Sequence, residues 1–185
     1  MNRDLLELDR TRLFEAAALP HLNSAYNLAR WLLRDEHHAE DVVQEAFLRA
    51  FRYFESFKGG DARPWLMGIV RNTSYSWMRE HARRAEQPLE LDEELENDAY
   101  EPGGNQTDKN PETLLMQKHE SSRVNAAIER LPAVFRETLV LRELEDMTYE
   151  EIAQIAGIPM GTVMSRLSRA RRLLRDILTE VIKED

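Results

Sequence analysis

The feature that most limits how this chain can fold is a helix-turn-helix pattern in residues 147–171. Thr148, followed three residues later by Glu151, forms a capping box: the hydroxyl and the carboxylate each accept a hydrogen bond from a backbone N–H that the helix leaves unpaired. A short apolar face follows, and then Gly157 stands where a left-handed residue commonly ends a helix. The pattern therefore predicts a short helix, a tight turn and a second helix.

The second of these helices has an apolar face and a basic face. At about 100° per residue, one stripe of the helix is apolar, and we expect it to be buried: Val163, Leu167, Ala170 and Leu174. The opposite face offers hydroxyls and guanidinium groups, which suit DNA phosphates and guanine edges. The candidate DNA contacts on this helix are Gly161, Thr162, Ser165, Arg166, Ser168, Arg169 and Arg172. The alternative is an amphipathic helix with a solvated basic face, although no carboxylate interrupts that face before Asp176.

Helical periodicity dominates the rest of the chain as well, and strand signals are almost absent. The predicted fold class is therefore all-α. The expected helices span residues 4–18, 22–34, 39–56, 64–82, 112–130, 133–144, 148–156 and 160–181.

Charge is distributed unevenly along the 185 residues, whose formal net charge is −9. Residues 86–120 carry 11 acidic and two basic side chains, so this segment accounts for the whole excess. The two flanking parts are nearly neutral, and the acidic total is no argument against binding to nucleic acid. The polar, Pro- and Gly-containing middle predicts a flexible acidic linker over 86–111. It would join two small helical domains, 1–85 and 112–185.

The sequence contains no cysteine, which excludes disulfides and thiolate metal sites. The N-terminal residues lack the apolar core of a signal peptide, and no uncharged apolar run is long enough to span a membrane. We therefore expect a soluble cytoplasmic protein without membrane insertion.

Two surfaces of the first domain are candidate binding surfaces. The helix 39–56 has an apolar stripe and an opposite polar face, which could dock a partner or could simply favour the helix dipole. The helix 64–82 has a basic face with a tyrosine, and the loop 56–63 before it could hold an unstacked base; the alternative is an ordinary surface loop and helix. The candidate residues of this loop and helix are Phe57, Lys58, Asp61, Arg63, Arg71, Asn72, Tyr75 and Arg79.

These residues resemble a known family. The run 39–51, followed by Trp65, Leu66, Ile69, Arg71, Asn72, Thr73 and Arg79, resembles the second conserved region of bacterial sigma factors. The runs 131–136, 149–153 and 161–171 resemble the fourth region. Their order and spacing, and the missing third region, resemble the extracytoplasmic-function (group four) class. The chain departs from the common pattern at Ser76 and Met164, where the family often has an acidic and a basic residue.

The resemblance implies a subunit that binds core RNA polymerase and directs promoter-specific transcription initiation, with no catalytic site, cofactor, metal or small-molecule substrate. It also implies a stress or envelope regulon and control by an anti-sigma protein. The candidates in 57–79 would contact the proximal promoter element, and those in 161–172 the distal element. The polymerase contacts implied on helix 39–56 are Asp41, Gln44, Glu45, Leu48 and Arg49. We also hypothesise that the acidic linker screens the basic faces in the free protein.

Two other classes of protein remain as alternatives. One is a stand-alone dimeric helix-turn-helix regulator, which would bind an operator without polymerase. The other is a helical metalloenzyme that would use His37, His38 and nearby carboxylates. The Glu-x-x-His spacing of a di-metal bundle is missing from the sequence, which argues against the second.

Overall fold

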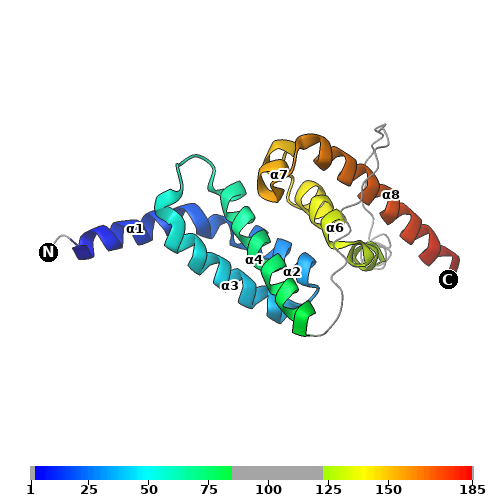
Figure 1. The fold of residues 1–185 in the computed structure, drawn as a ribbon, viewed down its shortest axis with the longest axis horizontal. Coiled ribbons are helices and arrows are strands. Elements are labelled where there is room, and N and C mark those ends of the chain that lie inside the picture. Colours follow the sequence, from blue (N-terminus) through cyan, green and yellow to red (C-terminus); the bar gives the residue numbers. More distant parts are fainter. Residues whose placement is uncertain (1–2, 85–122, 185) are drawn as a thin grey trace, which may run out of the picture.

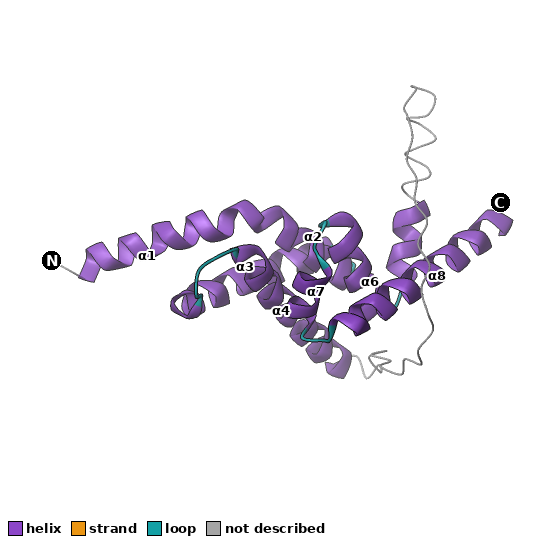
Figure 2. Cartoon of the chain, turned by 90° about the horizontal axis from the view of Figure 1, so that it is seen from above, coloured by secondary structure: helices purple, strands orange, loops and turns teal. Residues whose placement is uncertain are grey.

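The computed structural model describes residues 3–84 and 123–184, and every regular element in these two ranges is helical. The predicted all-α class is confirmed. Figures 1 and 2 show two groups of helices packed side by side, with α1–α4 in the first group and α6–α8 in the second. The predicted linker 86–111, with its proposed screening role, lies outside the described residues, as does the start of the predicted helix 112–130.

The first group consists of α1 (Arg3–Ala18), α2 (Leu22–Leu33), α3 (Glu36–Tyr53) and α4 (Ala62–Arg84), with short 3-10 turns at Leu19–His21 and Phe54–Ser56. Helix α3 begins three residues earlier than predicted because Asp35 caps it. The Asp35 carboxylate accepts a hydrogen bond from the backbone N–H of His38 at 2.8 Å. Helix α1 joins the group through Phe14, whose buried ring makes edge contacts with three phenylalanines of α3 and the following turn.

The second group consists of helical residues 123–130, α6 (Ala133–Leu139), a π-helical turn (Val140–Leu144), α7 (Tyr149–Ala156) and α8 (Met160–Glu184). The predicted helix 133–144 therefore changes its winding part-way along. A π turn accommodates one extra residue, and such turns are frequent at functional sites. Here the turn is closed by Glu145, whose backbone N–H donates to the carbonyl oxygen of Val140 at 3.0 Å. The side chain of Glu145 is directed inward and is buried.

The helix-turn-helix predicted from the capping box is confirmed in α7 and α8. The backbone N–H of Thr148 donates to the Glu151 carboxylate at 2.7 Å, and the backbone N–H of Glu151 donates to the Thr148 hydroxyl at 3.2 Å. Helix α7 ends at Gly157, which has a left-handed φ of 66° and donates its N–H to the carbonyl of Ala153. The turn chemistry in the sequence therefore fixes where both helices begin and end.

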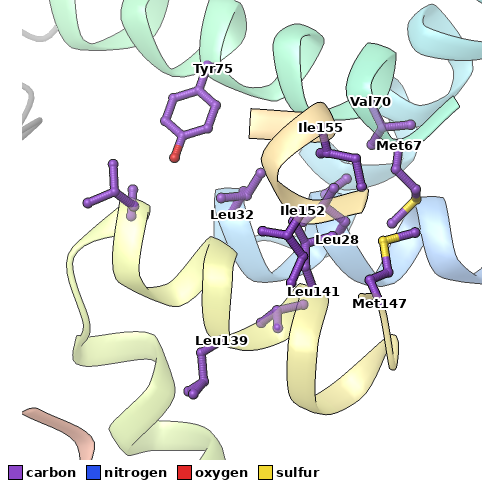
Figure 3. Packing of buried hydrophobic residues seen from close by; sticks show 14 of the residues in the cluster. Leu28, Leu32, Met67, Val70, Tyr75, Leu139, Leu141, Met147, Ile152 and Ile155 are labelled. Carbon is purple, nitrogen blue, oxygen red and sulfur yellow. The ribbon is translucent and has the colours of Figure 1, made fainter. Parts of the chain in front are cut away.

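The two groups of helices share one hydrophobic core. Figure 3 shows side chains of α2 and α4 meeting side chains of the π turn, the following loop and α7. The residues that meet in this core include Leu28, Leu32, Met67 and Val70 from the first group and Leu141, Met147, Ile152 and Ile155 from the second. Removing this apolar surface from water stabilises the contact between the groups. The helical periodicity predicted two small domains and contained no sign that they pack together.

A buried arginine anchors the same contact. Arg136 of α6 is 2% exposed, and its guanidinium donates to the carbonyl oxygens of Leu131 at 2.6 Å and of Leu32, in the other group, at 3.2 Å. Burial lowers the pKa of Arg136 to about 10, with Arg34 adding to the effect. The carbonyl partners offset part of the cost of burying this cation. Arg136 thus ties the end of α2 to the start of α6.

Candidate nucleic-acid interface

Helix α8 buries most of the predicted apolar stripe, but it also buries Arg166, which we expected on the accessible DNA-facing side. Val163, Leu167 and Ala170 are each no more than 1% exposed, whereas Leu174, the last member of the predicted stripe, is half-buried. Gly161 and Arg172 are exposed on the other side. Four further candidate contacts are half-buried: Thr162, Ser165, Ser168 and Arg169. The face they form can approach a DNA groove because its centre consists of small side chains.

The loop before α4 is anchored at one end and open at its tip. Phe57 is half-buried and packs against the rings of Phe54 and Trp65, at centroid distances of 6.1 Å and 5.0 Å. Lys58 and Asp61 are exposed, and two glycines with positive φ lie between them. The Asp61 carboxylate also accepts the backbone N–H of Arg63 at 2.9 Å, which supports the start of α4. The tip thus carries charged side chains on a backbone that its flanks hold in place.

Arg63, at the start of α4, contacts the second group of helices. Its guanidinium donates to the carboxylate of Glu145 at 3.0 Å and to the backbone carbonyl of the same residue at 2.7 Å. It also donates to the hydroxyl of Ser24 at 3.3 Å, and Asn27 donates its side-chain amide to Glu145 at 3.2 Å. The Glu145 side chain is only 5% exposed. Arg63, which we predicted to contact DNA, is therefore paired with Glu145, a buried carboxylate that follows the π turn.

A second cluster joins α4 to α6 about two helical turns further along. Arg71 forms an ion pair with Glu137, whose side chain is fully buried. The hydroxyl of Tyr75 donates to the same carboxylate at 3.2 Å, and the Arg71 guanidinium lies over the Tyr75 ring, 4.6 Å from its centroid. Figure 3 shows Tyr75 pointing from α4 toward α6. One carboxylate of the second group therefore binds two predicted DNA contacts of the first.

Burial shifts the protonation equilibria of this cluster. Removal from water raises the pKa of Glu137, and the nearby Arg71 and the Tyr75 hydroxyl oppose that rise. Burial and the Glu137 charge together raise the pKa of Tyr75, so its hydroxyl keeps its proton and remains a donor. In this cluster the Glu137 carboxylate is therefore the acceptor, and Arg71 and the Tyr75 hydroxyl are its two donors.

The structure divides the predicted DNA contacts into covered and open residues. Arg63, Arg71, Tyr75 and Arg166 face the other group of helices, and Tyr75 and Arg166 are only 7% and 5% exposed. The open residues among the described candidates include Lys58, Asp61, Asn72, Arg79, Gly161 and Arg172. We expected the basic face of helix 64–82 to be accessible, and in this arrangement its centre is covered. The roles of all these residues in DNA binding stay predictions.

The candidate docking face on α3 is open. Asp41, Gln44 and Leu48 are exposed, and Leu48 retains 49% of its accessible surface. Glu45 and Arg49 are half-buried and form an ion pair one turn apart, at 2.7 Å. An exposed leucine between charged side chains offers apolar contact to a partner. Helix α3 packs mainly against α2 and α4.

Glu137 and Glu145 are the two functional candidates that the sequence reasoning missed. The local sequence does not distinguish them from surface carboxylates, because Glu137 lies between Arg136 and Thr138 and Glu145 between Leu144 and Asp146. A carboxylate must find a partner when it is buried. Only the packing of the two groups shows that these two carboxylates are buried and which cations are their partners.

Residues 3–84 and 123–184 hold no group of histidine and carboxylate side chains that could bind a metal. His38 instead lies against Trp77, with ring centroids 4.4 Å apart, and contacts the Asp35 carboxylate at 3.0 Å. In the same two ranges, each helix is too short or too polar to cross a lipid bilayer.

Comparison with known proteins identifies both groups of helices. Residues 18–84 match the family model of sigma-70 region 2, and residues 121–174 match that of sigma-70 region 4. The chain is 38% identical to the ECF RNA polymerase sigma-E factor of Escherichia coli K12 over 145 residues, 77% of this chain and 75% of that protein. It is 34% identical to the ECF RNA polymerase sigma factor SigE of Mycolicibacterium smegmatis over 86% of this chain, and spans 59% of that relative's length.

Two solved structures resemble the fold over most of the chain. The sigma factor RpoE of Bartonella quintana, solved with the anti-sigma factor NepR, superimposes with a TM-score of 0.67 at 29% identity, over 90% of this chain and 96% of that one. CnrH, solved with the cytosolic domain of CnrY, superimposes with a TM-score of 0.64 at 22% identity, over 92% and 90% of the two chains, and its likeness concerns the fold alone.

Two helical regions in this order, each matched by its own family model, define a sigma-70-type transcription initiation factor. With its identity to the Escherichia coli relative, the chain belongs to the extracytoplasmic-function (ECF) sigma factors. From here on, the first group of helices is called region 2 and the second group region 4. The alternative of a stand-alone operator-binding regulator is therefore not retained.

Proposed function

We propose that the chain directs core RNA polymerase to promoters by alternating between a closed form, described above, and an open form in which region 2 and region 4 separate. The observation that carries this proposal is the pairing of two predicted promoter contacts, Arg63 and Arg71, with the buried carboxylates Glu145 and Glu137 of region 4. A carboxylate presents its oxygens to a guanidinium much as a phosphate does. The closed form and promoter DNA therefore compete for the same arginines.

In the open form, each surface has its own task. The loop 57–63 and the basic face of α4 would contact the proximal promoter element, where unstacked bases can meet aromatic and basic side chains. The exposed face of α8 would read the distal element in the major groove. The accessibility of Lys58 and Arg172 supports these assignments.

The exposed face of α3 would bind core polymerase, through Asp41, Gln44, Glu45, Leu48 and Arg49. Because this face stays accessible in the closed form, polymerase can make its first contact before region 2 and region 4 separate. Binding energy from further polymerase contacts would then offset the exposure of the shared core. The chain would work in the cytoplasm, together with the polymerase.

We further propose that an anti-sigma protein controls this chain, by binding the closed form and holding it. The similarity to RpoE of Bartonella quintana supports this, since that sigma factor was solved with its anti-sigma factor and the likeness covers 90% of this chain. A ligand that binds only one of two forms shifts the population toward that form. Such a partner would silence the chain without touching its DNA contacts directly.

The test is transcription from promoter fragments with bacterial core polymerase, with and without this protein, together with DNA footprinting of each component. We expect transcripts and a footprint only when both proteins are present. A specific footprint by the chain alone, with no effect on polymerase, would contradict the proposal. Leu48→Arg should abolish polymerase binding without unfolding the chain, whereas Tyr53→Arg, a change at another exposed position of α3, should leave it intact.

A further inference from the structure

A polar cleft of about 370 Å³ lies between region 2 and region 4. Helix α4 lines one side with Arg71, Tyr75 and Arg79, and region 4 lines the other with Arg166 of α8 and the backbone around Gly157. The volume lies within the range of ordinary small-molecule sites and is far too small for duplex DNA. The cleft exists because the two regions are packed together.

Arg166 is the most unusual side chain of this cleft. It is 5% exposed, and its Nε and Nη1 atoms are buried without a hydrogen-bond partner among the described residues. Burying a guanidinium without an anion is unfavourable, and for this reason buried cations are normally paired. Among the described residues, these two donor atoms of Arg166 have no acceptor, although Glu137 interacts electrostatically with its guanidinium.

The described charges around Arg166 compensate its charge only in part. Of the described residues that line the cleft, three are arginines and none is acidic. Glu137, the carboxylate that interacts electrostatically with Arg166, is already engaged by Arg71 and by the Tyr75 hydroxyl. Arg79 at the mouth makes a 3.4 Å hydrogen bond to the Ser76 hydroxyl, which carries no charge. Arg71 and Arg166 thus share one carboxylate, and together with Arg79 they leave the described lining of the cleft with an excess of positive charge.

We propose that this cleft is a binding site for a small phosphate-bearing anion. Arginine suits phosphate because its planar fork donates two parallel hydrogen bonds to oxygens of one group. Asn72 and Ser76, which also line the cleft, add neutral hydrogen-bonding groups for the remaining oxygens. Free pyrophosphate and the terminal phosphates of a nucleotide share this chemistry.

The site has a consequence for the equilibrium between the two forms. Its arginines come from region 2 and region 4, and the cleft is lost when the regions separate. A bound anion therefore favours the closed form by mass action. This inference goes beyond the proposed function, since it concerns the free chain and needs neither polymerase nor a promoter.

The test is calorimetric titration of the full chain with sodium pyrophosphate, with sodium phosphate and with ATP, each at low salt and matched ionic strength. We expect saturable binding of pyrophosphate or ATP with one site per chain. Arg79→Gln and Arg166→Gln should each weaken it about tenfold or more, the usual loss for a charge-assisted hydrogen bond. Arg175→Gln is the matched control, since this exposed arginine lies nine residues along the same helix as Arg166, about 14 Å away.

Ser76→Glu gives a second, independent test. It places a carboxylate beside Arg79 at an exposed helical position, so the fold should be unaffected while anion binding is lost. The proposal is overturned if no probe binds saturably, or if Arg175→Gln weakens binding as much as Arg79→Gln, which would indicate diffuse attraction. Stronger binding of ATP than of pyrophosphate would assign the site to nucleotides, and equal binding would assign it to the phosphates alone.

Discussion

At the scale of single residues, the contact between region 2 and region 4 depends on a few ion pairs that involve buried carboxylates. Glu137 is the most demanding of these groups, since its side chain is fully buried and it serves both Arg71 and Tyr75. Removing one partner of a buried pair leaves an uncompensated charge, which costs more than the pair itself contributes. Changes at this residue should therefore act on the closed form more strongly than changes at any exposed ion pair.

Glu137→Ala should destabilise the closed form by about 3–5 kcal/mol, because Arg71 and the Tyr75 hydroxyl both lose their acceptor. A double-mutant cycle with Arg71→Ala, read from the fraction of closed molecules, should show strong non-additivity. The control is Glu143→Ala, which removes an exposed ion pair with Arg171 inside region 4 and should change little. Equal effects of the two glutamate variants would exclude the role given to Glu137.

At the scale of helices, local sequence determined most of what was observed. The predicted helix 22–34 is found as Leu22–Leu33 and the predicted helix 148–156 as Tyr149–Ala156, since caps and turns act over a few residues. The π turn after α6 was not predicted. The apolar residues of this segment indicate a helix, but over five residues they do not distinguish an α-helical turn from a π-helical one. The direction of Glu145, and with it the contact to Arg63, could not be predicted for the same reason.

The capping box of α7 provides a direct test at this scale. Thr148→Ala removes the hydroxyl that accepts the backbone N–H of Glu151, and should lower the free energy of unfolding by about 1 kcal/mol. Thr179→Ala is the comparison, since its hydroxyl only donates to a carbonyl within α8 and its loss should be nearly neutral. Urea denaturation measures both, and an unchanged midpoint for Thr148→Ala would show that the cap contributes nothing.

The two faces of α8 predict two different phenotypes. Arg172→Ala should leave stability unchanged and weaken recognition of the distal element by about 1–3 kcal/mol, because this exposed side chain would lose a base contact. Leu167→Ala should instead lower the free energy of unfolding by about 2–5 kcal/mol, since Leu167 is 1% exposed in the core. Promoter binding by the holoenzyme and thermal unfolding of the free chain separate the two effects.

At the scale of the whole molecule, the arrangement of region 2 and region 4 lies beyond what the sequence could predict. Arg63 and Glu145 are 82 residues apart, and nothing in their local patterns pairs them. Periodicity predicts which face of a helix is apolar and cannot say whether that face meets its own domain or another. The candidate DNA contacts could therefore be named from the sequence, while the fact that four of them are covered could not.

The most direct test asks whether the chain is closed when it is free and opens when it binds polymerase. Because the sequence has no cysteine, labels can be placed uniquely at Arg52→Cys in region 2 and Asp176→Cys in region 4, both exposed positions. The measurement is the distance distribution between the two labels, in the free chain and in the transcriptionally active holoenzyme. We expect one short, narrow distance distribution for the free chain and a distribution at longer distances in the holoenzyme. The same distribution in both states, or a broad one in the free chain, would contradict this expectation.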